Sequence, residues 1–250
     1  MNDFLPELFA ATMDMLPQVV FNKGQKVHRT LIALYSTVIE QVDSAMILQA
    51  KGRSASLDII LRSCLEAYVD LVNLASDDGY MHQMEMSYHH EWVRLAKGAD
   101  PDNPYLASVI ADAESNAFHT SELARLAAIA PLMNTFERFK RAGMENEYRS
   151  VYNQLCSETH NNLRALIRRH FRFADDGDEN KLELIVMSEM EEGALVATLH
   201  TFIAVLGQSN VIIHDYFKTN AQDRALDLRR RIEAIEDPSA TVTMMQLETS

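Results

Sequence analysis

The sequence has few of the residues that reverse the direction of a chain. Eight glycines and six prolines among 250 residues are about half of the roughly 12% that average usage gives. So few turn-forming residues exclude the many short strands of a β-sandwich or a β-barrel, and they favour long helices. We therefore expect an all-α protein, a single multi-helix bundle of about seven to nine helices.

Cysteine is also scarce, with Cys64 and Cys156 as the two thiols. Both fall in apolar helical patterns without CxxC spacing, which favours buried free thiols in a reducing compartment. No HExxH pair and no Glu-x-x-His pair occurs, and Glu85 with His89 supplies at most two metal ligands. The phosphate-binding patterns GxxxxGK[ST] and GxGxxG are missing too. We expect no metal centre and no cofactor.

Positive charge is the third shortage. Lys and Arg number 23 against 36 Asp and Glu, so the formal net charge is −13. Such a chain repels polyanions at long range, which excludes generic binding to DNA and limits any contact with RNA to a local basic patch. The first lysine is Lys23, the reverse of the basic start of a secretory leader, so we expect a cytoplasmic protein.

One long segment has no charged residue at all. Gly193 to His214 contains no Asp, Glu, Lys or Arg, and its length suffices to cross a bilayer. However, His200, Gln208 and Asn210 make it too polar for a membrane span. Because apolar residues surround most of its circumference, we expect a buried central helix and no membrane contact. Surplus apolar surface on this helix would produce a homodimer.

Apolar periodicity and helix-breaking residues divide the rest of the chain. The predicted helices cover about residues 4–16, 24–51, 54–75, 80–97, 105–130, 145–171, 187–217 and 221–235. The clearest loops are residues 98–104 and the acidic stretch 175–179. No repeat and no long linker separates these helices. We therefore expect one helical bundle domain over residues 1–236 and a flexible C-terminal tail over 237–250.

The back of the third predicted helix carries charge. At about 100° per residue, Arg62, Glu66 and Asn73 share the side opposite the main apolar stripe, together with Ile59 and Val69. Aliphatic residues between the polar ones indicate that this side is partly covered too, where an ion pair needs hydrogen-bonding partners. The alternative is an ordinary surface pair of Arg62 and Glu66 one turn apart.

A second group of polar residues is Tyr152, Ser157, His160 and Asn161. Ser157 and His160 are three positions apart, so on one helix the imidazole could take the hydroxyl proton. A serine hydrolase would also need an oxyanion hole and an acid that orients the histidine, and no GxSxG turn occurs. A polar lock between helices, with His160 bonded to a neighbouring helix, fits the pattern better.

These two segments resemble a bacterial family called domain of unknown function 5677. RSASLDIILRSCLEAYVDLVNL is similar to its RSLLE helix, and YNQLCSETHNNLRAL to its helix with tyrosine, leucine-serine and histidine. The matching residues are Arg62, Ser63, Leu65, Glu66, Tyr152, Leu155, Ser157 and His160. Asn161 stands where the family has proline. The resemblance spans about residues 38–171 and implies a helical fold, while the family has no settled activity.

Local basicity is the third signal. Arg164, Arg168, Arg169, His170 and Arg172 lie within nine residues of an acidic chain. The five residues between Arg164 and His170 resemble the spacing of the Arg-His motif in HEPN-type helical ribonucleases. There, arginine offsets phosphate charge and histidine moves a proton at the ribose 2′-hydroxyl without metal. The alternative is a solvated helix end whose cations face the C-terminal dipole.

Two functional hypotheses follow. The first is a metal-independent RNA-cleaving or RNA-binding HEPN-like protein of the toxin or phage-defence type. In it Arg62, Glu66, Ser157 and His160 would form the catalytic centre, and Arg164, Arg168, Arg169 and His170 would bind RNA. The second is a non-enzymatic interaction or regulatory module in which a buried Arg-Glu-Ser-His network fixes the register of the helices.

Overall fold

The computed structural model describes residues 4–98, 102–159, 162–172 and 181–236. Within these ranges the chain is almost entirely helical, and the predicted all-α class is confirmed. The α-helices are α1 (Phe4–Met15), α2 (Lys26–Ala50), α3 (Leu57–Ser76), α4 (Met81–Lys97), α5 (Ala107–Ala111), α6 (Ala113–Ala127), α7 (Thr135–Arg141), α8 (Glu145–Glu147), α9 (Asn153–Thr159), α10 (Leu163–His170), α11 (Glu192–Tyr216) and α12 (Gln222–Glu236). Single 3₁₀ turns cover Leu16–Gln18, Ser54–Ser56 and Asp78–Tyr80.

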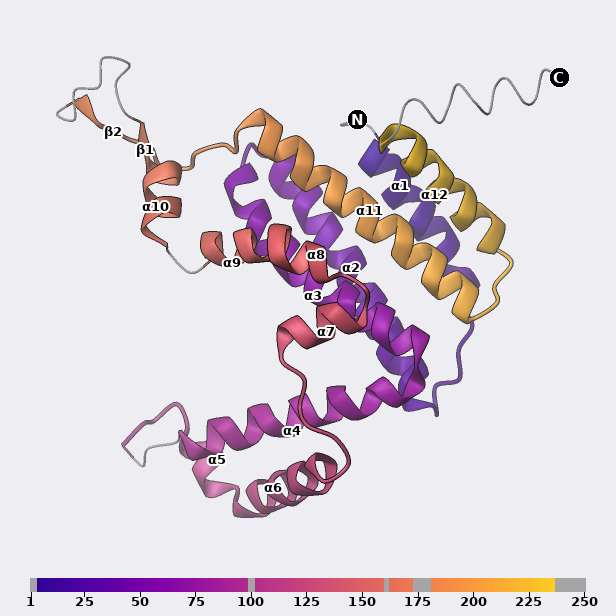
Figure 1. The fold of residues 1–250 in the computed structure, drawn as a ribbon, viewed down its shortest axis with the longest axis vertical. Coiled ribbons are helices and arrows are strands. Elements are labelled where there is room, and N and C mark those ends of the chain that lie inside the picture. Colours follow the sequence, from indigo (N-terminus) through magenta and orange to yellow (C-terminus); the bar gives the residue numbers. More distant parts are fainter. Residues whose placement is uncertain (1–3, 99–101, 160–161, 173–180, 237–250) are drawn as a thin grey trace.

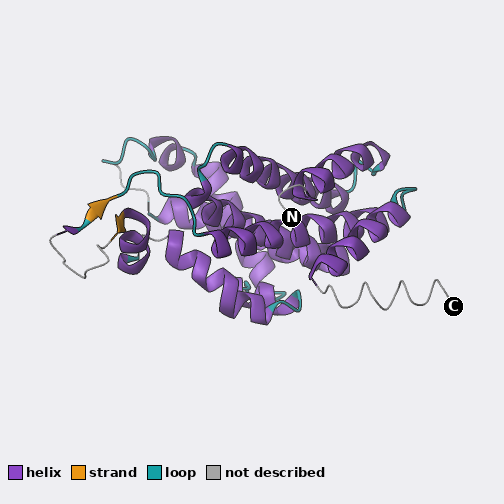
Figure 2. Ribbon diagram, turned by 90° about the horizontal axis from the view of Figure 1, so that it is seen from above, coloured by secondary structure: helices purple, strands orange, loops and turns teal. Residues whose placement is uncertain are grey.

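The core of the bundle lies between α2, α3 and α11, which pack against one another, with α1 and α12 against α11 (Figure 1). The uncharged segment forms most of α11, and its Phe202, Leu206 and Ile213 are fully buried. The prediction of a buried central helix is therefore confirmed. Figure 2, seen from above and coloured by secondary structure, shows that helices make up nearly all of the described residues.

A chain of polar groups crosses this core. The Tyr35 hydroxyl donates to Asn210 Oδ1 at 2.6 Å, and Asn210 Nδ2 donates to Thr12 Oγ1 at 2.8 Å. All three residues are fully buried. Because α1, α2 and α11 each contribute one residue, the hydrogen bonds fix how these helices face each other.

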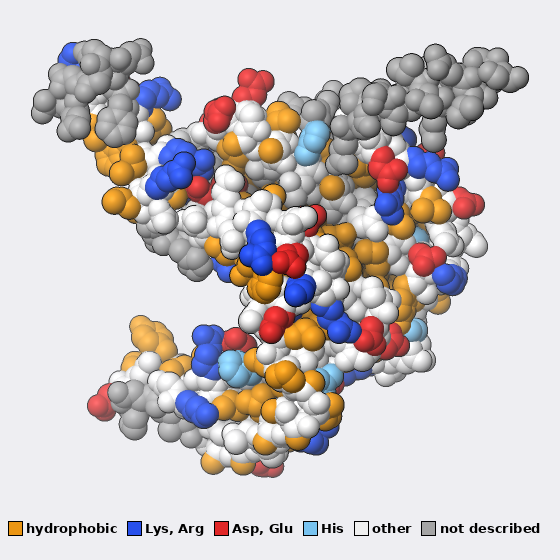
Figure 3. All heavy atoms as spheres, in the orientation of Figure 1, with side chains coloured by type: hydrophobic (Ala, Val, Ile, Leu, Met, Phe, Trp, Pro, Cys, Tyr) orange, Lys and Arg blue, Asp and Glu red, His pale blue; other side chains and the backbone are white. Residues whose placement is uncertain are grey.

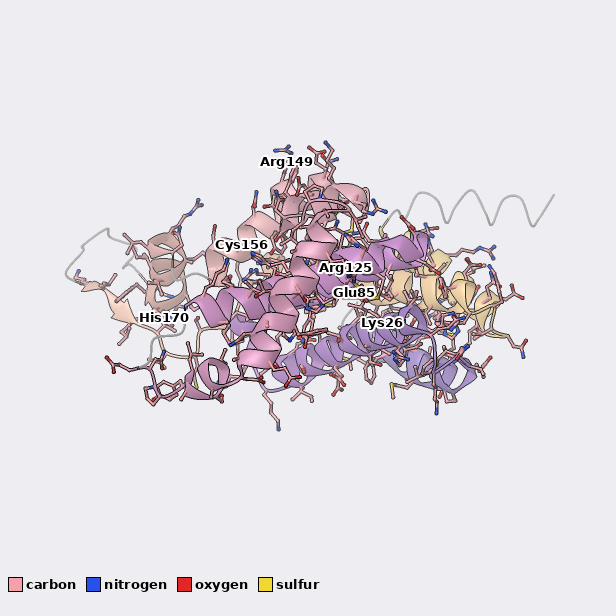
Figure 4. All side chains as sticks on the ribbon, turned by 90° about the horizontal axis from the view of Figure 1, so that it is seen from below. Lys26, Glu85, Arg125, Arg149, Cys156 and His170 are labelled. Carbon is pink, nitrogen blue, oxygen red and sulfur yellow. The ribbon has the colours of Figure 1, made fainter. Side chains whose placement is uncertain are left out.

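Helices α4 and α6 form an arm that projects from the bundle (Figure 1). Its interior is aromatic, with buried His89 on α4 and buried His119 on α6, and with Trp92 stacked on His119. The Lys26 ammonium at the start of α2 forms an ion pair with Glu85 on α4. Figure 4 shows Lys26, Glu85 and Arg125 gathered where the arm meets the bundle.

Two predicted long helices are divided in the structure. The helix expected over 105–130 breaks at Asp112, whose side chain caps α6 by accepting a bond from the Ser115 amide. The helix expected over 145–171 contains a π-helical turn, Tyr148–Tyr152, and restarts at Asn162, which caps α10. These breaks add short helices such as α5 and α8, and the number of helices in the described residues stays roughly in the predicted range.

Two elements were not expected from the sequence. Helix α7 lies between residues 131 and 144, where no helix was predicted, and Asn134 and Glu137 form a complete capping box at its start. A short antiparallel hairpin pairs β1 (Phe171–Arg172) with β2 (Glu183–Leu184). The acidic stretch 175–179 and the tail 237–250 lie outside the described residues.

Helices α2 and α11 are both long and apolar enough to cross a membrane by length and composition. In α11, 56% of the most apolar window is buried inside the bundle, and in α2 33% is buried. Core helices of bundles have the same length and composition.

Candidate functional site

Polar side chains follow one side of α3. Arg62, Glu66, Asp70 and Asn73 recur every three or four residues, which places them on one helical face. Helix α9 packs against α3 on this row, and so does α7. The row is therefore partly covered, as the aliphatic residues between its members predict.

The cluster at the α3–α9 contact joins Arg62, Glu66 and Tyr152. The buried Tyr152 hydroxyl donates to Glu66 Oε1 at 2.6 Å. Arg62 Nη2 lies 3.3 Å from the same oxygen, and its guanidinium sits 5.7 Å from the centre of the Tyr152 ring. Arg62 Nη1 also reaches Thr159 Oγ1 at 3.4 Å. One arginine thus contacts Tyr152, the residue just before α9, and Thr159, the last residue of α9.

The electrostatics of this cluster favour its hydrogen-bonded state. Burial and the bond to Glu66 raise the pKa of Tyr152, so the phenol remains a donor. Burial lowers the pKa of Arg62, but Tyr152 and Glu66 outweigh that effect and raise it overall. The side chains of Arg62 and Glu66 are 28% and 36% exposed. The pair is therefore half-buried. This lies between the two alternatives from the sequence, a covered ion pair with hydrogen-bonding partners and an ordinary surface pair.

A similar arrangement recurs about one turn further along α3. The Tyr80 hydroxyl donates to Asp70 Oδ1 at 2.7 Å, and Arg138 Nε lies 3.5 Å from that oxygen. Asn73 Nδ2 donates to the Arg138 carbonyl at 3.0 Å, which attaches α7 to α3. Burial raises the pKa of Asp70, while Arg138 and Tyr80 oppose the rise. Each half of the row thus combines a carboxylate, a tyrosine and an arginine.

Ser157 does not join the Arg62–Glu66–Tyr152 cluster. It is exposed, and its hydroxyl donates to the Asn153 carbonyl at 3.3 Å within its own helix. Two positions separate Ser157 from Thr159, which is about 200° around a helix, so only Thr159 faces α3. His160 and Asn161 lie outside the described residues.

The basic residues of α10 do not form one catalytic face. Arg164 and Arg168 are exposed, Arg169 Nη2 donates to the Ala55 carbonyl at 2.9 Å, and Arg168 pairs with Glu158 at 2.7 Å. His170 Nδ1 lies 3.1 Å from the Ile185 carbonyl at the hairpin. Arg164 and His170 are six positions apart, about 120° from each other around the helix. Figure 4 shows His170 apart from Cys156 on α9.

A cavity of about 750 Å³ separates α10 and the hairpin from α3, α9 and the start of α11. Arg168, Arg169 and Arg172 line it, opposed by Asp58 and acids of the facing segments. Two smaller cavities, of about 350 and 400 Å³, lie beside α11. The linings of these three cavities do not include Arg62, Glu66 or Tyr152. Sequence reasoning missed Asp58 and Glu158, because they lie within the two family-like segments but not among the residues that match the motifs.

No group of three or more His, Cys, Asp or Glu residues is placed to hold a metal ion in the part of the chain that the structure describes. The fold and the cluster therefore define an all-α protein in which polar side chains join the two helices bearing the sequence motifs. The chain belongs to the Family of unknown function (DUF5677), whose model matches residues 28–180. Neither a search of curated proteins nor one of solved structures gives a match.

Proposed function

We propose that the protein is a non-enzymatic helical interaction or regulatory module, in which the Arg62–Glu66–Tyr152 cluster fixes the register of α9 on α3. The supporting observation is the 2.6 Å bond from the Tyr152 hydroxyl to Glu66, which joins residues 86 positions apart. Such a bond between two helices selects one register, because a shift by one residue would leave both groups without partners.

The hydrogen bonds of Glu66 and the raised pKa of Tyr152 support a structural role more than a catalytic one. Glu66 Oε1 accepts from Tyr152 and pairs with Arg62, so one oxygen of the carboxylate holds both partners. A phenol with a raised pKa neither attacks as a nucleophile nor takes up a proton near neutral pH. A reaction centre would need a free base that faces a cleft.

A double-mutant cycle tests the lock. Tyr152→Phe, Glu66→Ala and the double variant are compared by chemical unfolding, with exposed Ser157→Ala as the control. We expect a coupling free energy of about 1 kcal/mol or more between the two sites and no effect of Ser157→Ala beyond a few tenths. Additive losses would show that the bond does not stabilise the native state.

RNA recognition at α10 is the second candidate function. Arg164 and Arg168 are exposed and four positions apart, so they share a helical face, and Figure 3 shows basic side chains over this helix. Two guanidinium groups at that spacing suit neighbouring phosphates of a single strand. The bond from Arg168 to Glu158 opposes such contact, because RNA would have to displace the carboxylate.

The RNA candidate has a direct test, which includes the HEPN-like cleavage hypothesis. Purified protein is incubated in EDTA with structured and unstructured RNA, beside Arg62→Gln, His160→Ala and His170→Ala. Cleavage that disappears in a folded variant would establish the enzyme and refute the non-enzymatic proposal. Binding without cleavage that weakens in Arg164→Gln would support RNA recognition alone. Equal traces of cleavage in all proteins would indicate contamination.

A homodimer remains a proposal as well. Helix α11 has no large exposed hydrophobic side chain within the described residues, so it does not supply the surplus apolar surface on which the dimer prediction relied. The arm instead exposes Tyr88 and Phe118, at 60% and 55%. Light scattering on the purified chain distinguishes one copy from two, and Phe118→Ser tests whether the arm holds them together.

A further inference from the structure

The largest of the three described cavities has the size and lining of a small-molecule site. Its volume of about 750 Å³ falls in the range of ligand pockets, roughly 300 to 1,000 Å³. Apolar side chains form part of the wall, among them Leu61 on α3, Leu155 on α9 and Met190 before α11. Charged groups from α3, α9 and α10 face the same space. The cavity thus offers both an apolar surface and charges that could orient a ligand.

Two of the three arginines in this wall, Arg168 and Arg169, already have partners, whereas the Arg172 side chain on β1 forms no ion pair with the described residues. Arg168 pairs with Glu158 at 2.7 Å, and the Glu158 side chain is only 9% exposed, so the two charges neutralise each other. Arg169 donates to the Ala55 carbonyl at 2.9 Å, which ties α10 to the turn before α3. An anionic ligand would have to break these bonds or compete with them.

Asp58 is in the opposite situation. Its carboxylate lines the cavity, half-buried in the first turn of α3, and no described side chain or amide lies within hydrogen-bonding or ion-pairing distance of it. Burial and the neighbouring Glu158 raise the pKa of Asp58, against the pull of Arg168 and Arg169. The cavity wall removes part of the water that would otherwise hydrate this carboxylate. A bound cation would therefore stabilise its negative charge. Glu189 and Glu191, also in the lining, add to the negative potential.

We propose that this cavity binds a small organic cation, a protonated amine carried on an apolar body, with Asp58 as the counter-ion. The ammonium group donates hydrogen bonds to the Asp58 carboxylate, and the apolar body lies against Leu61, Leu155 and Met190. This site is separate from the Arg62–Glu66–Tyr152 cluster, and it requires neither RNA binding nor the lock. It gives the proposed regulatory module a small-molecule ligand.

Three probes of similar shape and different charge test the proposal by titration calorimetry. Tryptamine is a cation at neutral pH, tryptophol is neutral, and indoleacetate is an anion. We expect saturable binding of tryptamine to the full chain, about tenfold tighter than tryptophol, because a charge-assisted bond distinguishes the two. Tighter binding of indoleacetate, or no binding of any probe, would overturn the proposal.

Two variants locate the site. In Asp58→Asn, tryptamine should bind no more tightly than tryptophol, whereas Glu40→Gln, an exposed carboxylate on α2, should leave the preference unchanged. Ala194→Leu, which adds volume inside the cavity wall, should weaken both probes together. Melting temperatures establish that the variants fold. Unchanged tryptamine affinity in a folded Asp58→Asn protein would refute the assigned counter-ion.

Discussion

The Nδ1 atoms of His89 and His119 lie 2.8 Å apart in the contact between α4 and α6. Both rings are buried, and Trp92, the single tryptophan of the chain, stacks on His119 with ring centres 4.6 Å apart. One Nδ1 must donate and the other must accept, so the bond survives only while at least one ring is neutral. The contact between α4 and α6 should therefore respond to acid. The fluorescence of Trp92 can follow that response.

Acidification should open this contact. Burial and His119 lower the pKa of His89, with Glu122 and Glu85 opposing and Lys26 adding to the effect. Unfolded histidine titrates near about 6.5, so the stabilisation by the neutral pair is complete above that pH. It is lost as the pH falls from there through the lower pKa of the folded state. Trp92 emission, followed against pH, should change in this window, because loss of the bond between His89 and His119 would shift the His119 ring on which the indole stacks.

Variants on the same arm identify the source of that change. His119→Gln should remove the pH step in Trp92 emission, whereas His90→Gln, an exposed neighbour on α4, should retain it. A step that persists unaltered in folded His119→Gln would assign the acid response to another group.

Asn210→Leu should destabilise the bundle strongly. The substitution leaves the buried Tyr35 hydroxyl without its acceptor and Thr12 without its donor. One or two unsatisfied buried groups cost about 2 to 4 kcal/mol in the free energy of unfolding, which urea titration measures. Adding Tyr35→Phe should recover part of the loss, because it removes one unpaired hydroxyl. A loss below 1 kcal/mol, at about the size of an ordinary surface change, would contradict this role.

Asn134→Ala should weaken α7. The Asn134 side chain accepts from the Glu137 amide at 3.0 Å, and Glu137 Oε2 accepts from the Asn134 amide at 2.7 Å. Removing an N-cap of this type costs about 1 kcal/mol. Asn134→Asp should retain the bond and most of the stability, so equal losses in the two variants would show that the cap is not the cause.

The two thiols should react differently in the native protein. Cys64 is fully buried, and burial raises its pKa to about 12, so very little thiolate forms at neutral pH. Cys156 is partly exposed on α9. A thiol reagent should therefore modify one cysteine rapidly in native protein and both after denaturation, and Cys156→Ser should abolish the rapid phase. Rapid labelling of Cys64 in that variant would reveal opening of the core.

The helical pattern could be read from the sequence wherever a single periodicity continues. Residues 57–76 and 192–216 form helices close to the predicted bounds, because one apolar stripe or an uncharged run extends through each. The pattern was less informative between residues 105 and 170, where side-chain caps at Asp112, Asn134 and Asn162 divide it. Such caps end helices by local hydrogen bonds that hydrophobic periodicity does not detect.

Part of the candidate site could be predicted from the sequence. The spacing of Arg62 and Glu66 puts them on one helical face in any structure that contains the helix. Their partner Tyr152 was among the residues that matched the second family motif, but its bond to Glu66 depends on how α9 packs on α3. The acidic partners of the basic cluster, Glu158 and Asp58, carry no signature in the sequence.

By itself, the sequence determined the all-α class, the buried central helix and the family, because composition, periodicity and motif residues depend on neighbours along the chain. Only the tertiary structure decided that Ser157 faces away from the cluster, that Glu158 neutralises Arg168, and that Asp58 faces a cavity. Those contacts join segments from different parts of the chain, and their distances depend on how whole helices pack against one another.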